Sequence, residues 1–432
     1  MKRQWFSYIL SVLTILPLSF LCLEHEKPSQ SKLTDNTQFK PDWSVLNFGA
    51  QCDGKTDDTK AFRQALLQSQ LTHPKHTGIL HIPGSVCKIS GTIEIPPHVV
   101  LQGEGRFSTV LFVDATEGTL LRIGGAGGSI KDLDIKYSHP PQKGIAIDAA
   151  STKPMLAQII NVMIENPYIG IDLSGNSIDV DHIRINGSSY IGVRIGHQTQ
   201  HADTVDPRVT NSTIASTNTA LAGMLIEDAG GLYLENNDVL YGKIGTYFSA
   251  GDNQQILWTF ANNTVLADTS IDVGLRIDAR YKNSIIKGLN FSNSWSSNIQ
   301  NGPGIAQYNM NNSDESLFNF SNMRVFTVGQ DAFHFQGSLV GLSLQNNVMC
   351  GNNKNSTSIY IGNNMKDYNI SDNNLSYHCG GWNYNNSTGI TILENSENGI
   401  IKYNNFSGIP FPINLKNKNM SKNLIFRDNI QK

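Results

Sequence analysis

Short stretches of alternating apolar and polar positions recur along the chain, which has 432 residues. Alternation over four to six residues is typical of a β-strand rather than of a helix. The commonest form is Gly-apolar-x-apolar, with a spacing that averages about 27 residues, a period typical of repeat proteins. The clear copies are GIAI from Gly144, GIDL from Gly170, GVRI from Gly192, GMLI from Gly223, GLRI from Gly274 and GITI from Gly389, and the weaker copies are GTYF from Gly245, AFHF from Ala332 and SIYI from Ser358.

A second alternating stretch follows the repeated strand and runs into asparagine, as in LYLENNDV from Leu232 and LSLQNNVM from Leu342. Asn and Gly favour turns and left-handed backbone positions. Two or three short strands per repeat, joined by such turns, predict an all-β chain: a single-stranded, right-handed parallel β-helix. About eleven coils fit between Ile130 and Asn429. An antiparallel sandwich or propeller would need tight Asn-Gly or Asp-Gly hairpins, which are scarce here.

The segment GAQCDGKTDDTKAF, from Gly49 to Phe62, has a different pattern, with three aspartates within six residues. Clustered carboxylates suit a metal site or an acid/base pair, but here they precede a stretch with helical periodicity. Asp57 and Asp58 are placed to cap a short helix expected from about Thr59 to Gln70. We therefore predict that the aspartates are structural and that the apolar face of this helix covers the open end of the β-helix.

The same region carries a family resemblance. The sequence VLNFGAQCDGKTDDTKAFRQAL, followed by GILHIPGSVCKISGTIEIPPHVVLQGEGRFSTVL, resembles the N-terminal signature of the pectate-lyase superfamily, in the branch with rhamnogalacturonase, epimerase-like and phage tailspike domains. The resemblance covers about residues 44–112, and the remainder is similar only as generic coils. It implies a pectin-lyase-like fold, in which this segment builds the first coils and a capping helix, and a role in polysaccharide degradation or binding.

The N-terminus and the composition set the expected location. Basic residues and a nearly unbroken apolar run make residues 1–23 a signal peptide or N-terminal anchor, and residues 24–44 read as a linker. Residues 45–125 are expected to form the cap and first coils, and 126–432 the remaining β-helix. We expect a secreted or periplasmic protein, or a membrane-anchored one if the first segment is not cleaved. The net charge of −3 gives no indication of the basic surface that binding to nucleic acid requires.

The cysteines agree with export. Apart from Cys22, four remain, and we predict the pairs Cys52–Cys87 and Cys350–Cys379, the latter separated by about one coil. Free buried thiols are the alternative. No CxxC motif is present, and two nearby histidines, at 197 and 201, lie in a polar loop, so no metal site is expected.

In the repeated strand the apolar residues should point inward, so that the x position and the residue two further on point outward. The x positions read Ala146, Asp172, Arg194, Leu225, Tyr247, Arg276, Ala306, His334, Tyr360 and Thr391, and the second position adds Glu227, Asp278 and Tyr308 in the middle coils. Aromatic rings stack on sugars and arginine pairs with carboxylates, so this face predicts binding of an acidic polysaccharide. The substrate-binding candidates are Arg194, Tyr247, Tyr308 and Tyr360. An ordinary solvated sheet face is the alternative.

Two catalytic schemes fit these residues. Glu227 and Asp278 occupy equivalent positions two coils apart, about 9 to 10 Å, which is the upper end for an inverting glycosidase. A lyase would instead need a base beside a uronate carboxylate, with Arg276 or His334 in reach and Arg194 or a Ca²⁺ ion neutralising charge. The residues leave this choice open.

A comparison with polygalacturonase-like relatives argues against their mechanism. Their catalytic acids and histidine stand immediately before the repeated strand, and in this chain only Asp331, in GQDAFHF, matches that column. Two functional classes remain: an exported glycoside hydrolase or polysaccharide lyase acting on a uronate-type glycan, and a non-catalytic β-helix that binds surface polysaccharide. The catalytic candidates are Glu227, Asp278, Arg276, His334 and Asp331. The sequence leaves monomer and trimer open.

Overall fold

The computed structural model describes residues 43–72, 78–309, 313–353, 356–376, 388–416 and 422–431. The predicted signal or anchor, 1–23, and nearly all of the predicted linker lie outside these ranges. The chain divides into two units, residues 1–40 and 41–432, and everything described belongs to the second unit. In the described part of the chain, no helix has the length and apolar character needed to cross a membrane.

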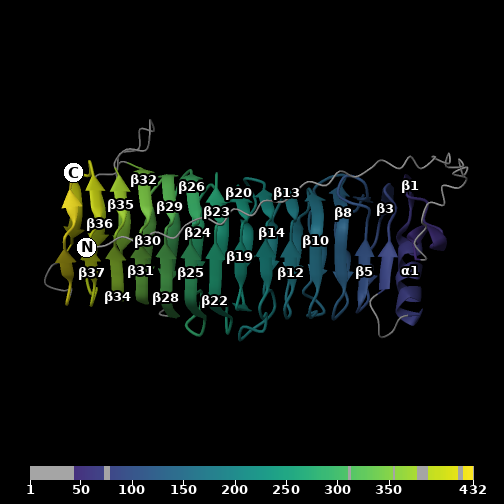
Figure 1. The fold of residues 1–432 in the computed structure, drawn as a ribbon, viewed down its shortest axis with the longest axis horizontal. Helices are drawn as coiled ribbons and strands as arrows, with labels where there is room; N and C mark the ends of the chain where they lie inside the picture. The colour runs from purple at the N-terminus through teal and green to yellow at the C-terminus, as the bar shows by residue number, and fades with distance from the viewer. Residues whose placement is uncertain are drawn as a thin grey trace, which may run out of the picture. The chain divides into compact units, whose positions relative to one another are not determined.

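The strands of this unit form two sheets that run along the stack of coils (Figure 1). The smaller sheet has 13 strands: β4 (Ile93–Ile95), β7 (Thr119–Ile123), β9 (Ile145–Ala149), β11 (Ile169–Leu173), β14 (Ile191–Ile195), β17 (Ala222–Ile226), β21 (Ile244–Phe248), β24 (Val273–Asp278), β27 (Ile305–Asn309), β30 (Phe333–Gly337), β33 (Thr357–Ile361), β36 (Thr388–Ile392) and β39 (Phe411–Leu415).

The larger sheet forms the rest of each coil and has 28 strands: β1 (Asp53–Asp57), β2 (Gly78–His81), β3 (Val86–Ile89), β5 (Val99–Gln102), β6 (Val110–Val113), β8 (Ser129–Tyr137), β10 (Gln158–Glu165), β12 (Asp179–Asp181), β13 (Arg184–Ser188), β15 (Arg208–Thr210), β16 (Thr213–Ser216), β18 (Ala229–Gly230), β19 (Tyr233–Glu235), β20 (Asp238–Leu240), β22 (Gln255–Asn262), β23 (Val265–Asp268), β25 (Ile285–Ser292), β26 (Trp295–Ile299), β28 (Asp314–Ser321), β29 (Arg324–Val328), β31 (Leu339–Gln345), β32 (Val348–Asn352), β34 (Met365–Ser371), β35 (Asn374–Ser376), β37 (Ile400–Lys402), β38 (Asn405–Ser407), β40 (Ile425–Arg427) and β41 (Ile430–Gln431).

The strand pairing confirms the predicted parallel β-helix. Each strand of the 13-stranded sheet pairs in parallel with the equivalent strand of the next coil, as β21 does with β17 and β24. Eleven of these strands, from β9 to β39, lie between Ile130 and Asn429, which is the number of coils that the repeat predicted. The pairing between β7 and β9 continues the same sheet across the expected boundary at residue 125.

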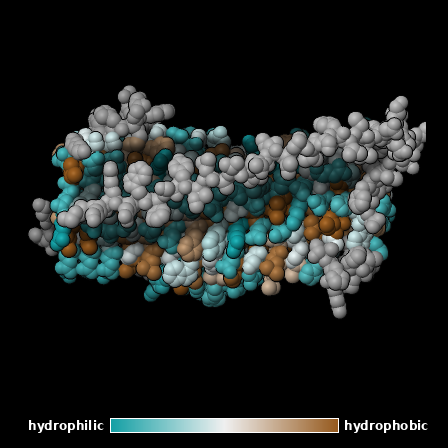
Figure 2. All heavy atoms as spheres, in the orientation of Figure 1, coloured by the Kyte–Doolittle hydropathy of each residue, from teal (hydrophilic) through white to brown (hydrophobic). Residues whose placement is uncertain are grey.

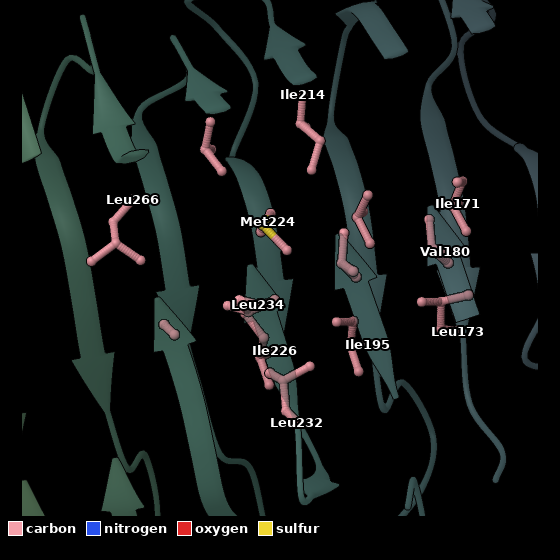
Figure 3. Close-up of a cluster of buried hydrophobic side chains, with 14 of the residues drawn as sticks. Ile171, Leu173, Val180, Ile195, Ile214, Met224, Ile226, Leu232, Leu234 and Leu266 are labelled. Carbon is pink, nitrogen blue, oxygen red and sulfur yellow. The ribbon is translucent and has the colours of Figure 1, made fainter. Parts of the chain in front are cut away.

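The core lies inside the coils, where the apolar positions of the repeat meet. Figure 3 shows side chains from the 13-stranded sheet, such as Ile171 and Ile226, pointing into the same space as Val180 and Leu266 from the other sheet. All four are completely buried, as the alternating pattern predicted. On the outside, the face in Figure 2 is largely hydrophilic, with hydrophobic residues in small separate patches.

The predicted helix is present as α1 (Thr59–Thr72) and lies at one end of the stack (Figure 1). A short 3-10 helix, η1 (Val45–Phe48), precedes it. The helical face that the sequence assigned to the cap is buried, with Phe62 and Leu66 at 0% and 1% exposure. The helix therefore covers the end of the core, where uncovered strands would expose their edges.

The clustered aspartates are structural, as predicted. Asp57 Oδ1 accepts a hydrogen bond from the Thr59 backbone N–H at 3.0 Å and so caps α1. The buried Asp58 carboxylate accepts from the backbone N–H groups of Gln51 and Cys52, at 2.7 and 3.0 Å. These bonds fix the loop that leads into the helix.

The cap also contains the predicted disulfide between Cys52 and Cys87, whose Cα atoms are 3.9 Å apart. Cys350 is disulfide-bonded as well. Because Cys379 lies outside the described residues, the predicted Cys350–Cys379 pairing stays a prediction.

The asparagines that recur in the turns form a buried ladder. Asn373 Oδ1 accepts from the backbone N–H of Asn347 at 2.9 Å, and Asn404 Oδ1 accepts from that of Asn373 at 3.0 Å. Asn373 Nδ2 also donates to the Leu344 carbonyl at 2.9 Å. The preceding Asp372 has a φ of 60°, in the left-handed region that Asn and Asp tolerate. The turn before β35 thus combines a left-handed residue with a buried asparagine.

Candidate functional site

The register of the 13-stranded sheet places the predicted outward positions in one column. Tyr247 pairs with Arg276, Arg276 with Ala306, Ala306 with His334, and His334 with Tyr360. These residues therefore lie on consecutive coils, each about 4.8 Å from the next. The predicted column is confirmed for the middle coils.

One position of the predicted column is wrong. In β9 the residue that pairs with Asp172 is Asp148, whereas the sequence pattern assigned Ala146. Both Ile145 and Ile147 are apolar, so the sequence GIAI matches the Gly-apolar-x-apolar motif two residues before the position that the strand pairing gives. Ala146 is completely buried and does not contribute to the outer face.

Arg276, in β24, lies between two tyrosine rings. Its guanidinium carbon is 5.2 Å from the ring centroid of Tyr247 and 5.2 Å from that of Tyr308, so the cation contacts an aromatic face on both neighbouring coils. Arg276 Nη2 donates to Asp278 Oδ2 at 2.7 Å, and the Tyr247 hydroxyl donates to the same oxygen at 3.2 Å. Arg276 Nε is buried and has no hydrogen-bond partner. The Arg276 side chain is nevertheless 34% exposed, so the accessible part of the planar fork can pair with an anionic ligand.

Burial shapes the electrostatics of this group. It raises the pKa of Tyr308 and of Tyr247, and in both cases the charge of Arg276 opposes the shift. The side chain of Asp278 is only 15% exposed, although it stands at an outward position of its strand. The ion pair with Arg276 stabilises the largely buried Asp278 carboxylate, because a buried charge requires a partner.

His334, in β30, is held by a carboxylate and by a stacked ring. Its Nδ1 lies 2.7 Å from Asp331 Oδ2, while Asp331 Oδ1 accepts the Thr357 backbone N–H at 2.7 Å. The imidazole stacks on Tyr360, with ring centroids 4.5 Å apart and an angle of 2° between the planes. His334 Nε2 points toward Gln336 Oε1 at 3.4 Å. A carboxylate that orients Nδ1 is the arrangement of a general base, in which Nε2, here 3.4 Å from the Gln336 amide, would take the proton.

Tyr308 connects the two groups. Its ring contacts the Arg276 guanidinium on one side and lies 5.7 Å from the His334 ring on the other. We use the name Arg276–His334 cluster for the continuous set that results. Its members are Tyr247, Arg276, Asp278, Tyr308, Asp331, His334 and Tyr360.

Glu227 lies outside this cluster, directly after β17. Its carboxylate oxygens are 2.9 Å from His197 Nδ1 and 3.7 Å from an Arg280 nitrogen. Ile226 pairs with Phe248, and Phe248 with Ile277, so Glu227 is two coils from Asp278, about 10 Å, as predicted. The structure thus confirms the equivalence of the two positions but gives each carboxylate its own basic side chains as partners.

Arg194 is likewise separate from the cluster. It forms an ion pair with Asp172, and the two side chains are 12% and 3% exposed. Burial raises the pKa of Asp172, and Arg194 opposes that shift. Because its side chain is 12% exposed, against 34% for Arg276, Arg194 is less suited than Arg276 to bind a substrate.

Sequence reasoning missed three residues that complete these contacts: His197, Arg280 and Gln336. Gln336 stood in the second outward position of its coil, so the column could have identified it. His197 and Arg280 lie in turns after β14 and β24, where the strand pattern gives no direction for a side chain. Only the folded coil shows that both face Glu227.

In the described ranges, one set of side chains has ligand atoms close enough to share a metal ion: Cys52, Asp58 and Cys87, all within 4.8 Å of one another. The two sulfurs are bonded to each other, so they are not available as thiolate ligands. His197 pairs with Glu227, whereas His201 is exposed in the turn that follows.

No family model and no curated protein matches the chain. Solved structures do. The A-module of mannuronan C-5 epimerase AlgE6 from Azotobacter vinelandii aligns with 89% of this chain and 99% of its own, at 13% identity and a TM-score of 0.59. The chain has the pectin-lyase-like β-helix fold. Pre-mature gene product 12 of bacteriophage phi29 shares this fold at 15% identity and a TM-score of 0.59, over 90% of this chain and 56% of that one.

A third pectin-lyase-like structure is PfbA, a surface adhesin of Streptococcus pneumoniae, with 12% identity, a TM-score of 0.51 and coverage of 88% of this chain and 93% of that one. The three proteins are described as an epimerase, a bacteriophage gene product and a surface adhesin, and they share one fold. Likeness at these identities concerns the fold, and function has to be argued from the site.

Proposed function

We propose that the protein is an enzyme that cleaves a uronate-containing polysaccharide by removing the proton beside the uronate carboxylate. The observation that carries this proposal is the Arg276–His334 cluster, in which a partly exposed guanidinium and a carboxylate-bound imidazole contact the same tyrosine ring. The fold is also that of a mannuronan C-5 epimerase, whose name places its chemistry on a polysaccharide.

Each residue has a role in this scheme. Arg276 pairs with the uronate carboxylate and stabilises the charge that moves onto it when the neighbouring C–H bond breaks. His334 Nε2 accepts that proton, while Asp331 stabilises the imidazolium that forms. The released electron pair forms a C4–C5 double bond as the C4–O bond breaks, and the Tyr308 hydroxyl protonates the departing oxygen. Water then returns a proton from His334 to Tyr308.

In this scheme Arg276 neutralises the charge of the uronate, a role that the sequence analysis assigned to Arg194 or a Ca²⁺ ion. Both arginines are paired with an aspartate, but the Arg194 side chain is 12% exposed and the Arg276 side chain 34%. The carboxylate beside Arg276, that of Asp278, is already paired with the guanidinium, which thus holds the position that a Ca²⁺ ion would need. We therefore assign charge neutralisation to the guanidinium.

Hydrolysis with Glu227 and Asp278 as acid and base is the second candidate. The equivalent positions of these residues, about 10 Å apart, favour it. Against it, both carboxylates are ion-paired, whereas the acid of a glycosidase must carry a proton when the substrate binds.

Turnover on a panel of acidic polysaccharides tests the proposal. We expect the wild-type protein to release unsaturated products, and Arg276→Lys to lower kcat/KM by about 100-fold, because an ammonium group cannot replace a bidentate guanidinium. Arg324→Lys, on the outer face of β29 in the larger sheet, is the matched control and should retain full activity. Tight binding without any turnover would instead support a non-catalytic polysaccharide-binding protein.

We also propose that the chain is exported. The basic start and apolar run of residues 1–23 support this proposal, and the disulfide in the cap suits an oxidising compartment. Cell fractionation with and without residues 1–23 tests it: the full chain should leave the cytoplasm, and the truncated chain should stay there.

A further inference from the structure

A cavity of about 230 Å³ lies beside the Arg276–His334 cluster, at the corner that follows β30 and β33. Its lining residues include Gln336, Gly337, Tyr360, Asn363, Asn364 and Leu393. Two of them contact His334 directly: Tyr360 stacks on the imidazole, and Gln336 Oε1 lies 3.4 Å from its Nε2. The cavity therefore adjoins the proposed reaction centre on the side of the C-terminal coils.

The chemistry of this cavity differs from that around Arg276. None of its lining residues is charged. Asn363 and Asn364 are exposed in the turn after β33, and their amides, like that of Gln336, can each donate and accept hydrogen bonds. Tyr360 and Leu393 provide apolar surface, as a sugar ring requires on its hydrophobic face. The volume is below the range of drug-sized pockets and suits one small ring.

The surroundings disfavour an anionic sugar at this position. Arg276 is three coils from Tyr360, about 14 Å, and so is too far away to pair with a carboxylate bound there. The nearest charge of the cluster is the Asp331 carboxylate, which adds to burial in raising the pKa of Tyr360. A uronate in the cavity would lose hydration without gaining a cationic partner among the lining residues.

We propose that this cavity binds an uncharged sugar residue next to the uronate held by Arg276. The proposal rests on the proposed function and narrows its substrate class. Because His334 and Tyr360 lie on adjacent coils about 4.8 Å apart, consecutive sugars of one chain can occupy the reaction centre and the cavity. The preferred substrate is then a polysaccharide in which uronates alternate with neutral sugars, rather than a homopolymer of uronates.

Kinetics on two polymers test this substrate class. The wild-type protein should have a higher kcat/KM for an alternating uronate–neutral polysaccharide than for a polyuronate. Asn363→Ala should lower kcat/KM for the alternating polymer about tenfold, the loss expected for one or two hydrogen bonds, with the effect in KM. Asn319→Ala, in β28 of the larger sheet, is the matched control and should change neither polymer. Equal activity on both polymers, unchanged in Asn363→Ala, would overturn the inference and leave the proposed function standing.

A binding measurement separates the two proposals if no polymer is cleaved. Side-chain amide NMR signals of Asn363 and Asn364 are followed during titration with the methyl glycoside of a neutral hexose and with that of a hexuronate. We expect the neutral sugar to shift these signals, the uronate to leave them unchanged, and Asn363→Ala to weaken the neutral sugar about tenfold. A preference for the uronate, or no shift with either, would contradict a neutral subsite whether or not the protein is an enzyme.

Discussion

At the scale of single residues, His334 carries the proposed chemistry because Asp331 holds its Nδ1 and Tyr360 fixes the ring plane. His334→Gln keeps a side chain that can bond to Asp331 but cannot accept a proton. We expect kcat to fall by about 10²- to 10⁴-fold with little change in KM. Steady-state kinetics give the split, with the exposed His182→Gln as control. A change confined to KM would make His334 a binding residue.

A pair of carboxylate variants separates the two catalytic schemes. If elimination is correct, Asp278→Asn should lower kcat/KM about tenfold by loosening Arg276, and Glu227→Gln should have little effect because Glu227 pairs with His197 and Arg280 instead. Hydrolysis by this pair predicts that each variant removes activity by orders of magnitude. The relative kcat/KM of the two variants therefore decides between the schemes.

The column of outward residues shows how far sequence reasoning reaches at this scale. Period-two alternation was enough to place Arg276 and His334 on one face, because the strand geometry dictates direction. It failed for Ala146, where isoleucines on both sides fit two frames. It could not show that Tyr308 contacts both Arg276 and His334, since ring positions depend on rotamers and packing.

At the scale of elements, β28 carries a buried carboxyl group beneath the cluster. Glu315 Oε1 accepts the backbone N–H of Ala279, the residue after Asp278, at 3.0 Å, and Oε2 accepts from Gln307 at 2.7 Å. Burial raises its pKa from 4.5 to about 8, opposed by these hydrogen bonds. The folded protein thus keeps a proton that the unfolded chain releases.

This difference makes stability depend on pH. Between about pH 4.5 and 8 the unfolded state binds fewer protons at Glu315 than the folded state, so stability falls as pH rises through this window. Glu315→Gln removes the titrating group and should flatten the dependence of the free energy of unfolding on pH in this window. The stability of the variant relative to the wild type should therefore be higher at pH 8 than at pH 5. Urea unfolding across this range measures it, and an unchanged slope would contradict the assignment.

The asparagine ladder is the second element-scale feature. Asn373→Ala leaves the Asn347 N–H and the Leu344 carbonyl without their buried partners, so we expect a loss of about 2–3 kcal/mol in the free energy of unfolding. Asn319→Ala, in β28, should change it by less than about 0.5 kcal/mol. Denaturant midpoints give both values. The sequence predicted the turns, but not that their asparagines are buried.

At the scale of the whole unit, the repeat determines the architecture and leaves function to a few coils. In the first coils the outward charges pair with one another, as Arg122 does with Glu94 and Asp148 at 3.0 and 3.1 Å. The middle coils add aromatic rings and a histidine to the pair of Arg276 and Asp278. The parallel β-helix could be predicted from the sequence because each coil repeats the same pattern. The reaction could not, because pectin-lyase-like structures include an epimerase, a phage protein and an adhesin.

The ratio of unsaturated ends to new reducing ends tests the central claim most directly. The wild-type protein is incubated with a uronate-containing polysaccharide, and ultraviolet absorbance of the C4–C5 double bond is compared with reducing ends released in the same sample. Elimination by the Arg276–His334 cluster predicts one double bond for every new reducing end. Reducing ends without the double bond would contradict the account and assign the reaction to hydrolysis.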